Sequence, residues 1–324
     1  MNSINIAIIG LGAIGQRLLP VIKNKANYHV IGGYDVDKTL KDRVCSDHGI
    51  WSYERVVDLI KDDRVEAVYL AVPPKYHEDL ALRILEAGKH LLCEKPLADT
   101  VEAARRMAEA ASKSDRVACM NFPLPYTSGV EEMRDCIQTG QLGLVKRIAI
   151  DGEFPDWPRK WQVNPWIDTR AEGGFVREVF THLIQLVIMT YGPIDHIRSF
   201  PQYPKDSNLS ERGIIAYGQA GQIPVSFNGI SHISHKEHLS LCISGDKASI
   251  CLENWRDLVW IDQEGPRPIE TLGVNPTEVL LDNFHKRIQG QEAYLVDFDM
   301  GYETVRVVET LLGNHKEELD NEAE

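Results

Sequence analysis

The sequence predicts an α/β protein of two domains: residues 1–121 form a doubly wound parallel sheet, and residues 122–316 form an α+β domain around a mostly antiparallel sheet. Three observations lead to this fold class. The 324 residues are enough for two hydrophobic cores. Short β-branched runs alternate with longer amphipathic segments up to Arg116, which is typical of repeated βαβ units. From Ile194 onward, alternating apolar and polar runs predict antiparallel strands instead.

The first domain is expected to alternate strands and helices. Apolar, β-branched runs predict strands at Ile4–Ile9, His29–Tyr34, Val65–Val72, His90–Cys93 and Val117–Met120. Apolar residues spaced three and four apart predict helices at Ile14–Lys25, Glu54–Ile60, Tyr76–Ala87 and Thr100–Ser112. Pro20 lies inside the first of these helices, so we expect a kink or an early stop there.

The second domain is expected to begin after Asn121, with a connector that contains Pro123 and Pro125. Its sequence predicts helices at Val130–Thr139, Val176–Tyr191, Pro276–Ile288 and Phe298–Leu312. Strands are predicted at Val145–Ile150, Arg212–Ala216, Pro224–Ile230, Leu239–Ser244, Ser249–Leu252 and Leu258–Ile261. The segment Asp151–Gly174, rich in Trp, Pro and Gly, is expected to be a loop that shapes a binding site. Residues 317–324 are expected to form an acidic tail.

The charge distribution excludes some classes of partner. The formal net charge is −13, and the excess of acidic residues lies entirely after residue 120. Such a surface repels nucleic acid and anionic lipid, so neither is expected as a partner. No run is long enough for a spanning helix and no signal peptide is visible, so we expect a cytoplasmic protein. The six cysteines show no paired spacing, which predicts reduced thiols and neither a metal site nor a disulfide.

A glycine-rich turn follows the first strand and leads straight into a helix. It reads Gly10-Leu11-Gly12-Ala13-Ile14-Gly15, which is the dinucleotide-binding fingerprint in its required context. Asp35 ends the next strand, where a carboxylate accepts hydrogen bonds from the adenosine ribose and repels a 2′-phosphate, so NAD is favoured over NADP. Asp37 could share this role. The alternatives are a glycine-rich turn that binds another ligand and an Asp35 that simply ends a strand.

Further cofactor contacts are expected where later strands end at the same edge of the sheet. The candidates are Val72, Pro73, His77, Glu94, Lys95 and Asn121. For His77, the competing interpretation is a surface histidine with no contact to the cofactor. For Lys95 it is a surface salt bridge.

Three motifs together resemble the glucose-fructose oxidoreductase, inositol dehydrogenase and MocA family (Gfo/Idh/MocA). They are the glycine fingerprint, Glu94-Lys95-Pro96, and the run from Gly173-Gly174 to His182. The resemblance covers nearly the whole chain. It implies a Rossmann domain followed by an α+β domain with a large open sheet that mediates dimers or tetramers, with substrate between the domains. It also implies a cis peptide bond before Pro96.

The resemblance implies that Lys95 and His182 carry out the reaction. Lys95 would contact the nicotinamide ribose and the reacting oxygen, and His182 would be the general acid/base. The residue types are consistent with these roles. Hydride leaves a carbinol carbon only as the hydroxyl proton is removed, and a histidine, with an unperturbed pKa near neutrality, can accept that proton. Glu178 lies four residues before His182 on the predicted helix and could orient the imidazole or bind a hydroxyl. A core histidine is the alternative for His182. Glu178 replaces the usual Asp of the family, and Leu124 stands where the family often has Arg or Tyr.

The expected function is an NAD-dependent dehydrogenase that interconverts a secondary alcohol and a ketone on a small polar substrate such as a sugar, inositol or sugar acid. Candidate substrate contacts in the aromatic loop are Trp161, Trp166, Asp168 and Arg170. Loop packing and surface charge are the alternative explanation for these residues. Reduction of an imine or another C=X bond, and a non-catalytic NAD-responsive regulator, remain alternative functions.

Overall fold

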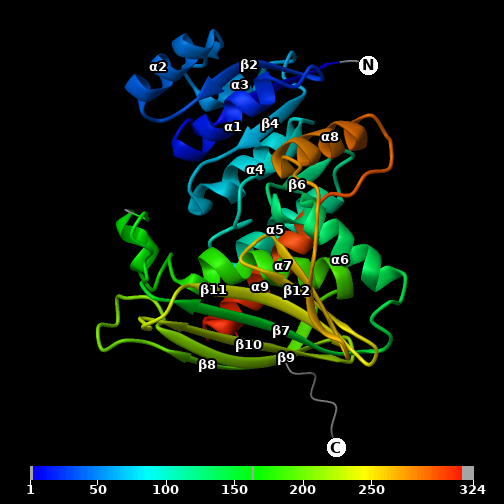
Figure 1. Ribbon diagram of the computed structural model, residues 1–324. Coiled ribbons are helices and arrows are strands. Elements are labelled where there is room, and N and C mark those ends of the chain that lie inside the picture. Colours follow the sequence, from blue (N-terminus) through cyan, green and yellow to red (C-terminus); the bar gives the residue numbers. More distant parts are fainter. Residues whose placement is uncertain (1–2, 163, 316–324) are drawn as a thin grey trace, which may run out of the picture. The chain divides into compact units, whose positions relative to one another are not determined.

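The computed structural model describes residues 3–162 and 164–315 (Figure 1). The chain divides into two compact units, Met1–Pro123 with Asn275–Tyr302, and Leu124–Val274 with Glu303–Glu324. The sequence predicts a second domain that runs without a break from residue 122, whereas in the structure Asn275–Tyr302 clusters with the first unit. The predicted acidic tail lies outside the described residues.

The first unit is built on a six-stranded sheet in the order β3-β2-β1-β4-β5-β6, with every neighbouring pair parallel. Its strands are β1 (Ile4–Ile9), β2 (Tyr28–Tyr34), β3 (Trp51–Ser52), β4 (Ala67–Leu70), β5 (His90–Cys93) and β6 (Ala118–Met120). The chain runs outward from β1 through β2 to β3 and then returns to the other side of β1 as β4. In a doubly wound sheet, ligands bind at this reversal, at the carboxyl ends of the strands.

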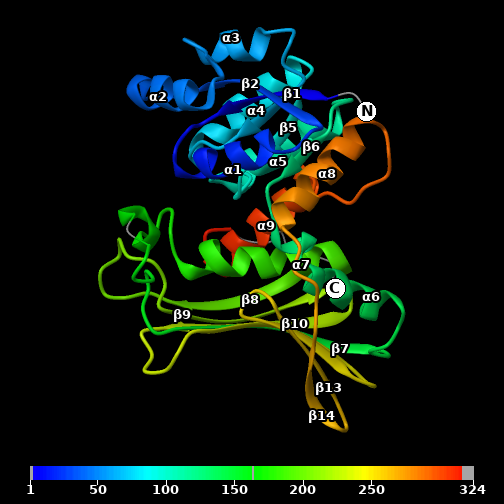
Figure 2. The same cartoon turned by 45° about the horizontal axis from the view of Figure 1, so that its top comes forward.

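The helices of the first unit flank this sheet, as Figure 2 shows. They are α1 (Ala13–Lys23), α2 (Lys38–His48), α3 (Val56–Lys61), α4 (His77–Glu86), α5 (Val101–Ser112) and α8 (Pro276–Ile288), with a short 3₁₀ turn, η1, at Pro74–Tyr76. The sequence predictions missed α2 and β3, because α2 has only a weakly apolar face, with Val44 and Cys45 as its buried apolar residues. The early stop expected at Pro20 is wrong, since α1 continues past it to Lys23.

The second unit contains an eight-stranded sheet in the order β14-β13-β12-β11-β7-β10-β9-β8. Its strands are β7 (Val145–Phe154), β8 (Ile194–Gln202), β9 (Gly213–Ala220), β10 (Ile223–Ser231), β11 (His238–Gly245), β12 (Ser249–Glu253), β13 (Asp257–Asp262) and β14 (Gly265–Ile269). Each neighbouring pair is antiparallel except β7 with β10. The expected, mostly antiparallel sheet is therefore confirmed.

Helices cover one face of this sheet and leave the other open (Figures 1 and 2). They are α6 (Ser128–Gln138), α7 (Thr181–Tyr191) and the part of α9 (Phe298–Leu311) that belongs to this unit. Short turns, η2 (Leu124–Tyr126) and η3 (Pro165–Asp168), occupy the connecting loops. The helix predicted over Val176–Tyr191 begins as a π-helical turn, η4 (Val176–Phe180), before it continues as α7. Within the described residues, no helix has both the length and the apolar character needed to cross a membrane.

One prediction about the cysteines is wrong. Cys242 and Cys251 form a disulfide between β11 and β12, although all six cysteines were expected to be reduced. Their strand register places them directly opposite each other. A separation of nine residues gives no sign of this in the sequence, because only the pairing of the two strands brings the thiols together.

Candidate active site

The three glycines of the fingerprint differ in what a side chain would meet at each position. Gly10 has φ +97°, and a Cβ there would lie 2.3 Å from the carbonyl oxygen of Ala71. A Cβ on Gly15 would lie 2.0 Å from the carbonyl oxygen of Gly10, so these two positions require glycine for packing. A Cβ on Gly12 would meet no atom within 4 Å. Gly12 therefore faces open space, as expected where a backbone must let a ligand approach closely.

The same turn starts α1 without a side-chain cap. Gly12 is the N-cap residue, and the first turn of the helix carries no acidic residue. The first amides of a helix have no intrahelical acceptor and carry partial positive charge, so they favour an anion. The open space at Gly12 and these uncapped amides fit the pyrophosphate of a dinucleotide.

Asp35 directly follows β2 and is hydrogen-bonded to the fingerprint turn. Its Oδ2 accepts a hydrogen bond from the Leu11 amide at 2.7 Å, and its Oδ1 accepts one from the Asp37 amide at 2.9 Å. Asp37 itself caps α2 by accepting from the Leu40 amide at 3.0 Å. The Asp35 carboxylate is thus oriented beside the glycine turn, whereas Asp37 has a helix-capping role.

Glu94 and Asn121 form a buried polar network where β5 and β6 end. The Glu94 carboxylate accepts hydrogen bonds from the Tyr69 hydroxyl and the Asn121 side-chain amide. Burial and the Glu94 charge raise the pKa of Tyr69 far above its ordinary value, so its hydroxyl remains a donor. Among the described residues, the buried Oδ1 of Asn121 has no partner. An orphaned acceptor at this edge fits a bound group that donates a hydrogen bond.

His77 is fully buried, so the surface-histidine interpretation is wrong. Its Nε2 lies 2.8 Å from the carbonyl oxygen of Val72, and its Nδ1 lies 3.1 Å from the carbonyl oxygens of both Pro96 and Leu97. The imidazole thus packs between the loop after β4 and the loop after β5, which carries Lys95. A neutral imidazole has one N–H, so it donates to the carbonyls on only one of the two sides. Burial lowers the pKa of His77. The expected cis bond between Lys95 and Pro96 is confirmed.

In the second unit, the turn before η4 is held by a buried carboxylate that the sequence analysis did not single out. Glu211 is 1% exposed, and its Oε1 accepts a hydrogen bond from the Val176 amide at 2.9 Å. A Cβ on Gly174, which has φ +102°, would lie 2.2 Å from Glu211 Oε2. The glycine is therefore required so that the carboxylate can reach the backbone at the start of η4.

Two side chains of η4 and α7 were predicted to act in catalysis. Both Glu178, in η4, and His182, in the first turn of α7, are half-buried. The His182 ring packs edge to face with Trp255, with ring centroids 5.5 Å apart and an interplanar angle of 83°. Trp255 was also missed, because it comes from a hairpin turn distant in sequence and belongs to no motif.

The four predicted substrate contacts have different surroundings. Asp168 forms a two-point ion pair with Arg212, at 2.6 and 3.0 Å, and accepts a hydrogen bond from Ser210. The guanidinium of Arg170 stacks 3.9 Å above the Tyr203 ring. Trp166 and Arg170 line one surface pocket, whereas Trp161 is 73% exposed. The structure thus brings Trp166 and Arg170 together and gives Asp168 a protein partner.

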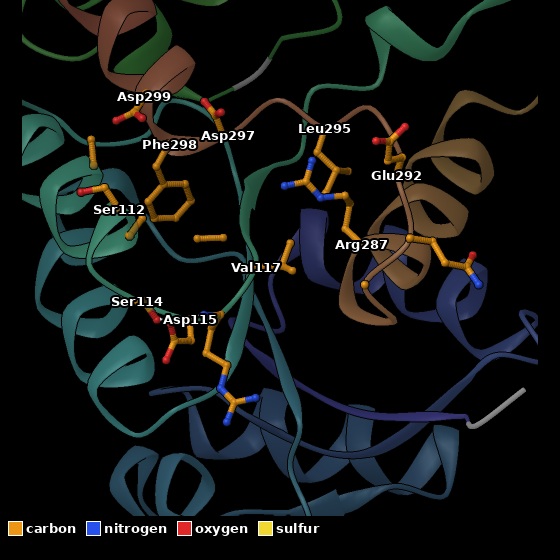
Figure 3. A pocket seen from close by; sticks show the side chains of 16 residues that line it. Ser112, Ser114, Asp115, Val117, Arg287, Glu292, Leu295, Asp297, Phe298 and Asp299 are labelled. Carbon is orange, nitrogen blue, oxygen red and sulfur yellow. Dashed lines mark hydrogen bonds between the residues drawn. The ribbon is translucent and has the colours of Figure 1, made fainter.

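A cavity of about 560 Å³ lies elsewhere in the first unit (Figure 3). It is lined by Val117, where β6 begins, together with Asp115, Arg287 and Asp297. This is the amino end of β6, whereas Asn121 follows its carboxyl end. The cavity is therefore separate from the edge at which the fingerprint and Lys95 lie.

Comparison with known proteins identifies the dinucleotide-binding part. Residues 4–122 match the family model for Gfo/Idh/MocA, described as an oxidoreductase family with an NAD-binding Rossmann fold. Residues 4–122 therefore belong to the Gfo/Idh/MocA oxidoreductase family. The predicted resemblance and the Rossmann fold of the first unit are confirmed.

Individual Gfo/Idh/MocA relatives match parts of the chain. Glucose-6-phosphate 3-dehydrogenase of Bacillus subtilis is 29% identical over 56% of this chain and 52% of its own length. Inositol 2-dehydrogenase of Corynebacterium glutamicum is 29% identical over 66% of this chain and 61% of its own length. The matched stretches thus span only about half of these curated relatives.

The whole fold also occurs in solved Gfo/Idh/MocA-like structures. A levoglucosan dehydrogenase in complex with NADH and L-sorbose superposes with a TM-score of 0.83, covering 97% of both chains at 18% identity. At this identity the likeness shows the fold alone. It extends over both units, including the mostly antiparallel sheet that the family model does not reach.

Proposed function

We propose that the protein is an NAD-dependent oxidoreductase that transfers hydride between nicotinamide and a secondary alcohol or ketone of a sugar, inositol or related polar molecule. The observation that carries this proposal is the arrangement along one sheet edge. The adjacent strands β1, β4 and β5 end in the glycine fingerprint, the Val72 loop and the Glu94-Lys95 loop, respectively. Lys95 thus lies at the same edge as the dinucleotide fingerprint. A cation at this edge can stabilise the negative charge that develops on the substrate oxygen during hydride transfer.

The proposed chemistry divides between three side chains. When bound, the nicotinamide ring accepts the hydride that leaves the carbinol carbon. His182 takes the hydroxyl proton, and the Lys95 ammonium stabilises the oxygen as negative charge develops on it. Glu178 orients the imidazole or holds a neighbouring hydroxyl. In the reverse direction, His182 returns the proton to the oxygen of the ketone.

We infer a preference for NAD over NADP from Asp35. Its carboxylate is held beside the fingerprint by the Leu11 amide, in a position to accept from ribose hydroxyls and to repel a 2′-phosphate. Asp35→Asn keeps an oxygen for the Leu11 amide and removes the charge. We expect kcat/KM with NADP to rise by about tenfold, a change of roughly 1.4 kcal/mol, as measured by initial rates with both cofactors. An unchanged ratio of the two rates would remove Asp35 from cofactor selection.

The decisive test follows NADH formation by absorbance with NAD and a panel of inositols, aldoses, sugar acids and amino sugars. The matched variant is Lys95→Met, which should lose turnover by at least about 100-fold while keeping NAD affinity. Turnover by Lys95→Met at the wild-type rate would contradict the proposed mechanism. Activity on cyclic imines but not on polyols would favour a C=X reductase. NAD binding with a protein partner and no turnover would favour a regulator.

Two glycine variants test the cofactor site independently of the substrate. Gly12→Ala places a methyl group in open space, so stability should hold while NAD affinity falls by about tenfold or more. Gly15→Ala drives its methyl group against the Gly10 carbonyl and should destabilise the fold itself. Calorimetric titration with NAD and thermal unfolding separate the two effects. Unchanged NAD affinity in Gly12→Ala would place the cofactor elsewhere.

We also propose that two copies of the chain associate through the open face of the eight-stranded sheet. Phe200, Ile215, Tyr217 and Ile230 are 72%, 61%, 45% and 44% exposed, and the strand register places them on one face of β8, β9 and β10. An apolar patch on neighbouring strands is typical of a subunit interface. Ile215→Asp should shift the sedimentation coefficient towards that of the monomer, whereas a monomeric wild-type protein would refute the proposal.

A further inference from the structure

The turn between β12 and β13 has an unusual residue at its tightest point. The Arg256 amide donates to the Glu253 carbonyl at 3.1 Å, which closes a four-residue turn around Asn254 and Trp255. Both central residues lie in the left-handed region, with φ +49° and +76°. Hairpins use this conformation readily when Asn occupies the first central position and Gly the second. Asn254 follows that rule, but Trp255 occupies the glycine position.

Other contacts fix this turn in place. The Asn254 amide donates to the Leu239 carbonyl at 2.8 Å, and the Asn254 side-chain oxygen accepts from the Leu239 amide at 3.3 Å. These bonds anchor the turn to the start of β11. A bulky residue in the left-handed region persists only where its surroundings over-determine it, and such outliers concentrate at functional sites. The anchoring through Asn254 supplies that determination.

The strained backbone directs the indole onto the predicted general acid/base. Trp255 and His182 meet edge to face, at 5.5 Å between ring centroids. The Trp255 side chain is half-buried, and its indole N–H has no acceptor among residues 3–162 and 164–315. By contrast, the Trp260 indole N–H donates to Asp262 Oδ2 at 2.8 Å. Trp255 therefore offers an aromatic surface and an unused donor directly beside His182.

We propose that Trp255 is a specificity-determining residue of the substrate site, which rests on the proposed function. Its indole packs against the apolar C–H face of a cyclic polyol or sugar whose hydroxyl is presented to His182, and its N–H donates to a neighbouring substrate oxygen. An amphipathic ring suits this kind of ligand, because one part of a sugar is apolar and the rest accepts hydrogen bonds. A linear or wholly apolar alcohol would use neither contact well.

Three variants separate the contributions of the ring, the N–H and the turn. Trp255→Phe keeps an aromatic surface and loses the donor. Trp255→Gly removes the side chain and suits the left-handed backbone, so the turn should still form. Asn254→Gly keeps the indole and removes the side-chain anchor to Leu239, so it measures what the anchored turn contributes. Thermal unfolding checks that each variant is folded. NAD binding should not change, since the fingerprint lies in the other unit.

For a cyclic substrate that the wild-type protein oxidises, we expect Trp255→Gly to raise KM by about tenfold or more. Trp255→Phe and Asn254→Gly should each raise KM by less, because the first keeps an aromatic ring and the second keeps the indole. The preference for cyclic over linear alcohols should shrink in Trp255→Gly. If the KM values of Trp255→Gly and the wild type agree, the proposal is wrong while the proposed function stands.

Ligand binding, followed by saturation-transfer NMR with the same panel, distinguishes the remaining outcomes. Binding without turnover in the wild type, lost in Trp255→Gly, would support the role of Trp255 and refute the proposed oxidoreductase activity. Binding without turnover that persists in Trp255→Gly would refute both proposals. Neither turnover nor binding of any sugar or polyol would also refute both.

Discussion

Each unit contains one buried titratable side chain that holds the backbone of a predicted functional segment, and the two do so with opposite chemistry. In the first unit, the His77 ring nitrogens face the carbonyl oxygens of Val72, Pro96 and Leu97. In the second, the Glu211 carboxylate accepts the Val176 amide at the start of η4. One residue therefore packs against carbonyls beside Lys95, and the other holds the turn that precedes Glu178 and His182.

The difference shows what burial demands of each type of group. A histidine can be buried neutral, and burial lowers the pKa of His77 in keeping with this. A carboxylate needs compensation: burial raises the pKa of Glu211, while the Val176 amide and the charges of Arg177 and Arg212 oppose the rise. Arg177 is in turn paired with Glu309 at 2.7 Å. The segment in the second unit thus depends on a network of charges around a buried carboxylate.

The largest effect is expected from Glu211→Ala. It leaves the Val176 amide without an acceptor and removes a charge from the arginine network, so the free energy of unfolding should fall by about 3 kcal/mol. Turnover should fall as well, because the turn before η4 loosens. Chemical denaturation and initial rates measure the two effects. Glu211→Gln keeps an oxygen for the amide and is the matched control, so equal losses in both variants would show that charge, and not the hydrogen bond, is what matters.

A smaller loss is expected from His77→Ala. Carbonyl oxygens tolerate the loss of a donor better than amides tolerate the loss of an acceptor, so we expect about 2 kcal/mol. Since this ring packs against the Lys95 loop, kcat should fall more than NAD affinity does. His77→Asn retains a donor for one carbonyl and should recover part of both quantities. A kcat equal to that of the wild type in His77→Ala would show that the Lys95 loop is positioned without the imidazole.

Mild acid should affect the two units in opposite directions. Because the pKa of His77 is lowered in the folded state, the unfolded chain binds more protons below about pH 6.5, and this contribution to stability falls as the pH drops. Because the pKa of Glu211 is raised, the folded chain binds more protons above about pH 4.5, and its contribution rises as the pH drops. Hydrogen exchange of each unit in His77→Asn and Glu211→Gln, compared with wild type, measures these slopes. Slopes of the same sign would contradict this assignment.

The smallest effect is expected from reduction of the disulfide, which lies only in the second unit. The unfolded, unreduced protein should titrate four thiols, from Cys45, Cys93, Cys119 and Cys136, and the reduced protein all six. Reduction should leave NAD binding by the first unit unchanged. Cys242→Ser should give the same thiol count with and without reductant. Six thiols in the unreduced wild type would show that the pair is not bonded.

Much of the first unit was predictable from local pattern. The strands Ile4–Ile9 and His90–Cys93 were predicted with the bounds that the structure gives. The glycine fingerprint from Gly10 to Gly15 was also predicted, because a βαβ turn repeats the same close contacts wherever it occurs. His77 was a candidate for the cofactor site, but nothing nearby in sequence shows that its acceptors are carbonyls on two different loops.

The second unit was predictable in its strands and much less so in its contacts. The motif from Gly173 to His182 identified the helix, but Glu211 and Trp255 reach that helix from segments next to strands, 35 and more residues away in sequence. Cys242 and Cys251 meet for a similar reason, through strand register. Such pairs leave no spacing signal in a single sequence.

The sequence by itself therefore determined the fold class and the dinucleotide fingerprint, because these depend on periodicity and on glycines at fixed local spacing. The residues proposed for catalysis came from the resemblance of its motifs to a known family. Only the tertiary structure decided which buried groups hold those residues and what lies against His182. Hydrogen-bond partners, ring contacts and disulfide pairs are chosen by where distant strands and loops meet, and that is set by packing of the whole core.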